Sequence, residues 1–207
     1  MSDGLIVIGG GEYARVVIEA AQAQGFDVLG FVDPQPCEET CQRLKVRHLG
    51  TDDNLPESPL LVLAVGSVKV EDTRSKIVQK IEARRAVRWT TVVHPRAWVS
   101  PTAIVEPSAV ILAGAVVCSG ARIGAHAIVN ICASIDHDVV VGKFVHVAPH
   151  AALGGGAQIG DHAYIGMSAV IRDHRKVAER TLVGMAAVVT KEFPAGAVLI
   201  GSPARTL

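Results

Sequence analysis

The second half of the chain places an apolar residue at every sixth position. Seventeen consecutive positions in steps of six, from Val93 to Val189, hold Val, Ile or Leu. Four residues after each of the first sixteen, the chain has alanine in twelve cases. An α-helix repeats at 3.6 residues and a strand at 2, so neither alone gives a fixed spacing of six. A short strand followed by a turn does, and the pattern predicts a parallel β-helix of hexapeptide repeats.

The first part of the chain follows a different pattern, in which apolar runs alternate with helical periodicity. Residues 5–8 form an apolar run that ends in three glycines, a helical pattern then stops at Gly25, and residues 26–32 predict a second strand. Residues 60–65 predict a buried parallel strand and residues 71–85 a helix. The sequence therefore predicts a Rossmann-like βαβ domain over residues 1–88. The β-helix, with a short C-terminal tail, follows over residues 89–207.

The glycine turn near the N-terminus matches a fingerprint for nucleotide binding. Gly9, Gly11 and Ala14 fit the G-x-G-x-x-A pattern after a strand and before a helix, and Asp33 lies about where a ribose-binding acid would. Glycines let the backbone approach a phosphate, and the helix N-terminus offers free N–H groups. A domain this short corresponds to only one mononucleotide-binding half. The pattern favours a nucleotide or nucleotide sugar over NAD, and a purely structural tight turn stays open.

Composition and charge narrow the class of protein. Of the 207 residues, 49% are hydrophobic but only 4% aromatic, so the core is expected to be aliphatic. Twenty basic and twenty acidic residues cancel, which argues against a nucleic-acid partner because such a partner needs a clustered basic face. The apolar runs are too short for membrane insertion, and the first residues do not resemble a signal peptide. We therefore expect a cytoplasmic protein.

The cysteines agree with that location. Cys37 and Cys41 have the spacing C-x3-C, and no second pair with the spacing of a zinc site follows them. We expect reduced thiols and no metal site.

Within the repeat, one segment combines titratable groups. His137 lies between Asp136 and Asp138 in the stretch that begins at Asn130. A neighbouring carboxylate can orient one imidazole nitrogen and leave the other free to accept a proton near neutral pH. A histidine at a turn of a β-helix is more commonly a solvated surface residue, so this segment alone leaves both interpretations open.

A second histidine, His146, follows nine residues after His137. If three hexapeptides make one coil of about 18 residues, nine residues correspond to half a coil. The two histidines would then lie on different sides of one chain. They can share a site only if two subunits meet, which predicts an active site at a subunit interface.

Three segments together resemble one family of enzymes. They are residues 6–11 (IVIGGG), residues 130–138 with His146, and residues 201–204 (GSPA). They are similar to the bacterial sugar acyltransferases of the PglD and NeuD type, and the resemblance covers the whole chain. It implies a left-handed β-helix, a homotrimer, and acetyl-CoA bound between neighbouring β-helices.

The resemblance also implies roles for individual residues. His137 matches the general base, Asp138 the carboxylate that supports it, and Asn130 an asparagine near the reacting centre. The positions expected to contact acetyl-CoA are His146, Gly155, Met167 and Met185. The positions expected to hold the nucleotide sugar are Gly11, Glu12, Tyr13, Asp33, Pro34 and Gly66. The family commonly has Gly-His where this chain has Glu12-Tyr13, and glycine where it has His150 and Ser168.

The resemblance implies an acetyl-CoA-dependent N-acetyltransferase. Its acceptor would be the amine of a nucleotide-linked amino sugar, a 4-amino-4,6-dideoxyhexose, used for surface glycans or glycoproteins. An O-acetyltransferase of the sialic acid (NeuD) type would use the same residues, so the sequence does not separate the two. A third alternative is a β-helix scaffold or nucleotide sensor without catalytic activity.

Overall fold

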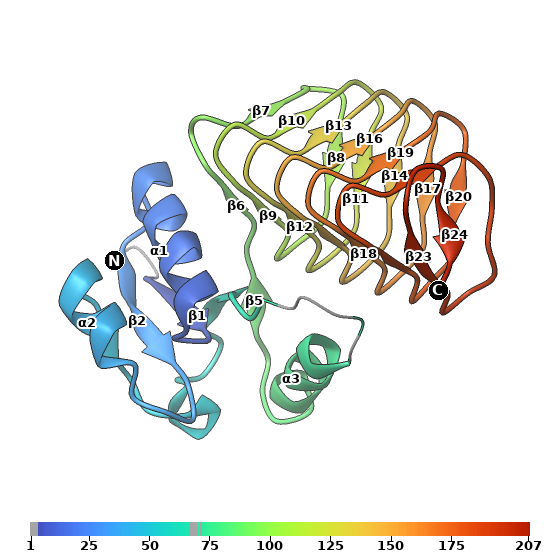
Figure 1. Ribbon diagram of the computed structural model, residues 1–207. Helices are drawn as coiled ribbons and strands as arrows, with labels where there is room; N and C mark the ends of the chain where they lie inside the picture. The colour runs from blue at the N-terminus through green and yellow to red at the C-terminus, as the bar shows by residue number, and fades with distance from the viewer. Residues whose placement is uncertain (1–3, 67–69, 71) are drawn as a thin grey trace. The chain divides into compact units, whose positions relative to one another are not determined.

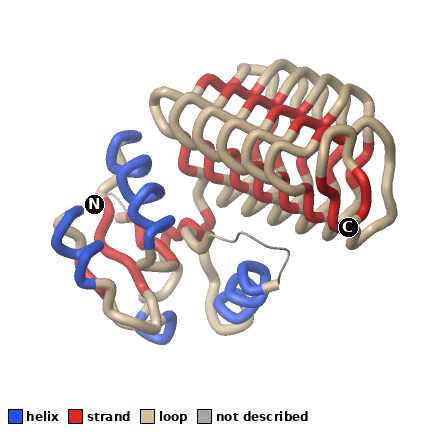
Figure 2. Tube along the Cα trace, viewed as in Figure 1, coloured by secondary structure: helices blue, strands red, loops and turns tan. Residues whose placement is uncertain are grey.

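The computed structural model describes residues 4–66, 70 and 72–207, and within these ranges the chain forms two compact units. The first contains the described residues up to Gly66 together with Asp72–Pro95, and the second contains Arg96–Leu207. Each unit has buried apolar residues of its own, and Figures 1 and 2 show its helices and strands.

The first unit is an α/β unit built on a parallel sheet in the order β3-β2-β1-β4-β5. Its strands are β1 (Leu5–Ile8), β2 (Val28–Val32), β3 (Arg47–His48), β4 (Leu60–Leu63) and β5 (Arg88–Trp89), and β6 (Val92–Val93) follows them. Its helices are α1 (Glu12–Gln24), α2 (Glu38–Leu44) and α3 (Thr73–Glu82), with a short 3-10 helix η1 (Asp52–Asn54). The strand order reverses direction between β1 and β4, which is the arrangement of a doubly wound nucleotide-binding fold.

The sequence placed the boundary between the units at residue 88, but the α/β unit continues beyond it. Trp89 pairs with Leu61 of β4 in the parallel sheet, so its backbone belongs to the first unit. Hydrophobic periodicity could not show this, because β5 is only two residues long.

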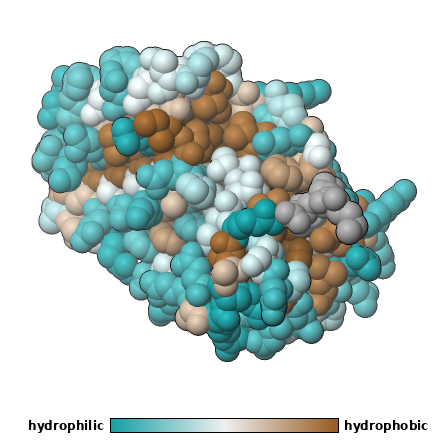
Figure 3. All heavy atoms as spheres, turned by 180° about the vertical axis from the view of Figure 1, so that it is seen from behind, coloured by the Kyte–Doolittle hydropathy of each residue, from teal (hydrophilic) through white to brown (hydrophobic). Residues whose placement is uncertain are grey.

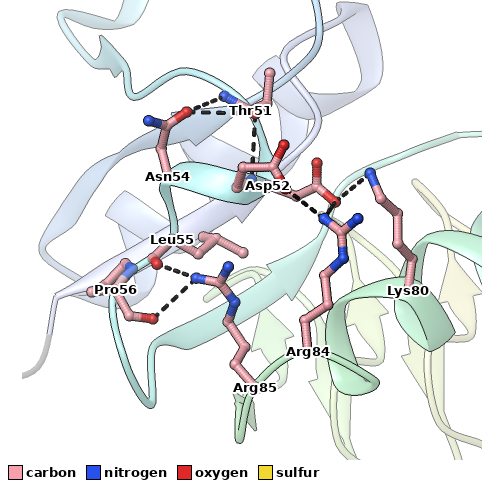
Figure 4. Close-up of polar contacts among 9 residues, drawn as sticks. Thr51, Asp52, Asn54, Leu55, Pro56, Lys80, Arg84 and Arg85 are labelled. Atoms are coloured by element: carbon pink, nitrogen blue, oxygen red, sulfur yellow. Dashed lines mark hydrogen bonds and ion pairs between the residues drawn. The ribbon is translucent and has the colours of Figure 1, made fainter.

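A polar cluster fastens α3 to the loop that follows β3 (Figure 4). Lys80 Nζ lies 2.7 Å from Asp52 Oδ2, and Arg84 Nη1 lies 2.5 Å from Asp53 Oδ1. The guanidinium of Arg85 donates to the carbonyl of Leu55. These ion pairs and this hydrogen bond hold α3 in place at the exposed surface of the unit.

The second unit is a left-handed parallel β-helix with three faces. Sheet I contains β7 (Trp98–Val99), β10 (Val116–Val117), β13 (Ser134–Ile135), β16 (Ala152–Leu153), β19 (Val170–Ile171) and β22 (Val188–Val189). Sheet II contains β8 (Ile104–Val105), β11 (Arg122–Ile123), β14 (Val140–Val141), β17 (Gln158–Ile159) and β20 (Lys176–Val177). Sheet III contains β9 (Val110–Ile111), β12 (Ile128–Val129), β15 (His146–Val147), β18 (Tyr164–Ile165), β21 (Leu182–Val183), β23 (Val198–Ile200) and β24 (Arg205–Thr206).

The repeated aliphatic positions fill the interior of the β-helix. Successive coils pair residues eighteen positions apart, as Val117 with Ile135 and Ile135 with Leu153, except that Val183 in the last coil pairs with Leu199, sixteen positions later. From Ile111 to Val189, every aliphatic residue of the six-residue repeat is at most 2% exposed. The predicted fold class, an α/β domain followed by a left-handed β-helix, is confirmed.

The turns between the sheets share one backbone conformation. From Ser108 to Ala186, the third residue after each inward aliphatic residue has positive φ, for example 58° at Asp138 and 59° at His126. This left-handed region is sterically costly for most residues and favours Gly, Asn, Asp and His. Most of these turn positions are therefore occupied by glycine or by polar residues for a backbone reason, before any function is considered, although Phe144 adopts the same conformation.

Candidate active site

His137 lies in the turn between sheets I and II, directly after β13, with a side chain 58% exposed. Its Nδ1 lies 3.0 Å from Oδ2 of Asp138, and its backbone N–H donates to Oδ1 of Asp136 at 2.7 Å. The turn conformation at Asp138 presents that carboxylate beside the ring. Because a carboxylate accepts hydrogen bonds, the contact places the proton on Nδ1 and leaves Nε2 as the acceptor of the neutral ring.

The two carboxylates also change the proton affinity of the ring. The hydrogen bond to Asp138 raises the pKa of His137 above its ordinary value, and the negative charge of Asp136 raises it further. A more basic imidazole is a stronger proton acceptor, provided that the pH keeps it neutral. The sequence named Asp138 for this role, and the structure adds Asp136.

The ring of His137 stands at the edge of a groove over sheet I. The groove has a volume of about 480 Å³, and its lining includes Cys118, Ser134, Ala152, Gly155, Val170 and Arg172. Gly155 lies one coil after His137, and its α-carbon faces the imidazole. Asp136 lines the same groove, so the groove and the histidine form one continuous site within the β-helix.

Asn130 and His146 form a second, buried cluster. Nδ2 of Asn130 lies 3.0 Å from Nε2 of His146, and the two residues are 9% and 8% exposed. Since the amide nitrogen of Asn130 is a donor, Nε2 of His146 accepts in this arrangement. The ring of Tyr164, one coil later, stands edge-on to His146 with centroids 5.2 Å apart. This packing fixes the orientation of the His146 ring.

The two clusters occupy different parts of one β-helix. His137 follows β13 of sheet I, whereas His146 belongs to β15 of sheet III. Asn130 lies in the turn between sheets III and I, and Met167 lies in the same turn two coils later. The side chains of Met167 and Met185 are exposed at 48% and 74%. One chain therefore carries two separate polar clusters on different parts of its β-helix.

In the α/β unit, the predicted nucleotide-binding residues gather at the carboxyl ends of β1, β2 and β4. Gly11 precedes α1 without any side-chain cap, which leaves the helix N-terminus open to an anion. Glu12 is exposed in the first turn of α1. The carboxylate of Asp33 connects two loops. Its Oδ2 accepts a hydrogen bond from the N–H of Gly10 at 2.8 Å, and its Oδ1 accepts one from the N–H of Gln35 at 2.9 Å. The carboxylate thus fixes the loop that contains Pro34.

Tyr13 and Gly66 meet at the same edge of the sheet. A side chain at Gly66 would lie 3.1 Å from the Cβ and Cγ atoms of Tyr13, so glycine permits this close approach. The hydroxyl of Tyr13 is buried, and burial raises its pKa. The positive charge of the buried Arg74 guanidinium, in α3, acts to lower the pKa of Tyr13. Burial lowers the pKa of Arg74 itself to about 10. If Tyr13 contacts the nucleotide sugar, the contact is therefore expected from its exposed atoms and not from its hydroxyl.

Sequence reasoning did not single out two buried polar residues of this region. Thr40 is fully buried and donates from Oγ1 to the carbonyl of Gly10 at 2.7 Å, which holds the glycine turn. Arg74 is 4% exposed. Both look like ordinary surface residues of polar helices in the sequence. The buried character of a helix position depends on packing that a single amphipathic pattern does not specify.

Two absences hold for the part of the chain that the structure describes. Over residues 4–66, 70 and 72–207, no group of three His, Cys, Asp or Glu side chains could hold a metal ion. Among the described helices, none is both long and apolar enough to cross a membrane.

The fold defines a class, the hexapeptide-repeat acyltransferases that carry an α/β unit. Residues 4–81 match the model of the PglD N-terminal domain. No curated protein matches the chain.

Solved structures with the same fold cover the entire chain. PerB from Caulobacter crescentus, in complex with CoA and GDP-perosamine, is 31% identical with a TM-score of 0.91, over 100% of this chain and 98% of that one. The acetyltransferase domain of PglB from Neisseria gonorrhoeae, in complex with acetyl coenzyme A, is 31% identical with a TM-score of 0.89, over 100% of both chains. WeeI from Acinetobacter baumannii, at 24% identity and a TM-score of 0.83, shares the fold over 99% of both chains. The chain belongs to the family of nucleotide-aminosugar N-acetyltransferases of the PglD type.

Proposed function

We propose that this protein transfers an acetyl group from acetyl-CoA to the amine of a nucleotide-linked 4-amino-4,6-dideoxyhexose. The observation that carries the proposal is the pairing of His137 with Asp138, with Nδ1 and Oδ2 3.0 Å apart at the edge of a groove. An exposed imidazole held in one tautomer by a carboxylate is the arrangement that general-base catalysis requires.

The chemistry follows from that tautomer. The sugar amine attacks the thioester carbonyl carbon, and a C–N bond forms. Nε2 of His137 takes the proton that the amine loses, directly or through a water molecule. The tetrahedral intermediate then collapses, the C–S bond breaks, and the imidazolium returns the proton to the departing thiolate of CoA. Asp138, and Asp136 by its charge, stabilise the imidazolium between these two steps.

We assign acetyl-CoA to the groove over sheet I. The groove is lined mostly by small and apolar side chains, such as Ala152 and Val170, which suit an extended thioester arm. The lining of the groove includes Gly155, beside the imidazole, and a thioester at that place would lie within reach of the base. The relative from Neisseria gonorrhoeae was solved with acetyl coenzyme A, in agreement with this cosubstrate.

We assign the nucleotide of the acceptor to the carboxyl edge of the α/β sheet. The uncapped N-terminus of α1 offers N–H groups to a diphosphate, and Gly11 there leaves space for it. The loop fixed by Asp33 and the residues near Gly66 lie at the same edge and would contact the nucleoside. PerB was solved with GDP-perosamine, a nucleotide-linked amino sugar.

We further propose a homotrimer in which the polar clusters of neighbouring chains complete one another. His137 from one chain would then face Asn130, His146 and the two exposed methionines of the next. The outer faces of the β-helix keep apolar side chains exposed, among them Trp98, Ile104 and Val170, and Figure 3 shows an apolar band across this unit. Contiguous apolar surface of this kind favours association.

Mixed oligomers test this assembly. His137→Ala and His146→Ala chains, each of low activity alone, are co-expressed with different tags and purified as mixed trimers. If the two histidines come from different chains, one of the three sites in each mixed trimer would be intact and activity would return. Activity that stays at the level of the separate variants would refute the shared site.

An acceptor panel tests the reaction itself. Acetyl-CoA is incubated with UDP-, GDP- and dTDP-linked 4-amino-4,6-dideoxyhexoses, with the matching 4-hydroxy sugars, and with sialic acid. We expect rapid release of CoA only with an amino sugar, together with an acetamide in the product. Acetylation of hydroxyl sugars or sialic acid alone would identify an O-acetyltransferase, and no turnover would favour a scaffold.

The free thiols at all four cysteines suit a reducing location such as the cytoplasm.

A further inference from the structure

Gly155 occupies a turn position at which the β-helix otherwise carries side chains. The position two residues after the inward aliphatic residue recurs in each coil of the turn between sheets I and II. It holds Ser119, His137, Gly155, Asp173 and Lys191 in successive coils. The φ angle of Gly155 lies outside the left-handed region, so its backbone does not require glycine. The reason for glycine at this one coil must therefore lie in its surroundings.

The three atoms nearest to the Cβ position of residue 155 all belong to the side chain of His137. A Cβ atom built on Gly155 would lie 2.5 Å from Nε2, 2.7 Å from Cε1 and 3.2 Å from Cδ2 of His137, and these are its three nearest atoms. The first two distances are shorter than any ordinary contact between such atoms. The backbones of the two coils are joined beside this position, since the N–H of Gly156 donates to the carbonyl of His137 at 2.9 Å. A side chain at position 155 would therefore displace the imidazole.

We propose that Gly155 is a positioning residue for acetyl transfer: its missing side chain forms the hollow in which the His137 ring lies. In that hollow the ring keeps Nδ1 on Asp138 and holds Nε2 over Gly155, which lines the groove. This role differs from the contact with acetyl-CoA expected at Gly155 from the family resemblance. The inference rests on the proposed function, because it gives the ring's position a catalytic meaning.

The test is Gly155→Ala, the smallest change that fills the hollow. We expect kcat to fall by about 10²-fold, since a displacement of a catalytic group by about 1 Å has that order of effect. The KM values for acetyl-CoA and for the nucleotide sugar should stay near wild type. A ring pushed away from Asp138 also loses the interaction that raises its pKa, so the acid limb of kcat/KM should move to lower pH. NMR titration of the His137 imidazole should show the same shift in the absence of substrates.

Two comparisons separate this inference from the proposed function. If His137→Ala keeps near-normal activity, the proposed catalytic role of His137 fails. If His137→Ala is inactive but Gly155→Ala has normal kcat and an unchanged His137 titration, only the inference is overturned. A large rise in the KM for acetyl-CoA with normal kcat would also overturn it, because the methyl group would then obstruct the coenzyme instead. Ser119→Ala, at the same turn position two coils before Gly155, is the control and should keep normal kcat.

A stability cycle keeps the inference testable if Gly155→Ala folds poorly. Gly155→Ala is combined with His137→Ala, which removes the atoms that the new methyl group would meet. We expect the melting temperature of the double variant to equal that of His137→Ala alone. If the methyl group still destabilises the chain when the imidazole is absent, the hollow does not serve the imidazole and the inference is wrong.

Discussion

The β-helix and the α/β unit place functional side chains in two different ways. In the β-helix every coil repeats the same backbone, so His137, Asp138 and Gly155 stand out as local exceptions on a regular frame. In the α/β unit the candidate residues lie on three loops of different length, and contacts such as Asp33 to Gly10 hold those loops together. The comparison teaches that a substitution at His137 or Asp138 in the first region should alter chemistry, whereas one in the second region should alter binding of the nucleotide sugar through loop geometry.

His137→Ala should give the largest effect and should be confined to the chemical step. Loss of a general base reduces turnover by roughly 10²- to 10⁴-fold. Because the imidazole is exposed and outside the core, the melting temperature and the KM for the nucleotide sugar should stay near wild type. Steady-state kinetics with an amino-sugar acceptor provide the measurement. A near-normal kcat for His137→Ala would show that the β-helix residues do not act on the chemical step, and the contrast with the α/β unit would be lost.

Asp138→Asn should give a smaller loss of activity together with a change in pH dependence. The carboxylate of Asp138 raises the pKa of His137, so the base of the wild-type enzyme becomes neutral only at a higher pH than an ordinary histidine. Removing the charge lowers that pKa, and the acid limb of kcat/KM should therefore move to lower pH. Asparagine tolerates the left-handed conformation at position 138, which keeps the turn intact. A limb that does not move would show that another group titrates.

Asp33→Ala should have the opposite kinetic signature, which sharpens the comparison. The loss of two hydrogen bonds from backbone N–H groups to a carboxylate loosens the glycine turn and the loop after β2. We expect the KM for the nucleotide sugar to rise about tenfold, in line with about 1.5 kcal/mol for a hydrogen bond to a charged group, while kcat changes little. Asp27→Ala, an exposed residue before β2, is the matched control. A fall in kcat at unchanged KM would contradict this assignment.

Arg84→Ala should give the smallest effect. The ion pairs of Arg84 with Asp53 and Asp52 are solvent-exposed, with 47% of the Arg84 side chain accessible. Exposed pairs contribute up to about 1 kcal/mol and weaken in salt. Chemical denaturation in low and in high salt provides the measurement, and activity should not change. A large loss of activity would mean that the cluster in Figure 4 supports the nucleotide loops directly.

The sequence predicted the β-helix well because the period of six leaves few alternatives. Ile135 and Leu153 lie in the positions that the repeat assigns, and the pairing at eighteen residues follows from three hexapeptides per coil. The contact of His137 with Asp138 was predictable from adjacency and turn conformation. The same arithmetic could have found Gly155 against the imidazole, because 155 lies one coil after 137, but the sequence assigned this glycine to the coenzyme.

The α/β unit was less predictable at the level of side chains. The strands β1, β2 and β4 and the glycine turn were evident, whereas the two-residue strands β3 and β5 were not. The burial of Arg74 and Thr40 depends on which side of α3 and α2 packs inward. Short, polar helices such as α2 do not reveal that in their periodicity. Likewise, the use of both Asp33 oxygens by backbone N–H groups cannot be inferred from a residue type, since a free carboxylate at the same position would suit a ribose equally well.

The regular pairing of residues eighteen apart has a consequence for how such an enzyme can change over evolution. A turn residue of the β-helix meets mainly the residues one coil before and one coil after it, as His137 meets position 155. Each position therefore has a short and predictable set of partners, and a substitution needs compensation only there. Chemistry at one coil can diversify without disturbing the others, so the scaffold behaves as a row of nearly independent sites rather than as a single cooperative core.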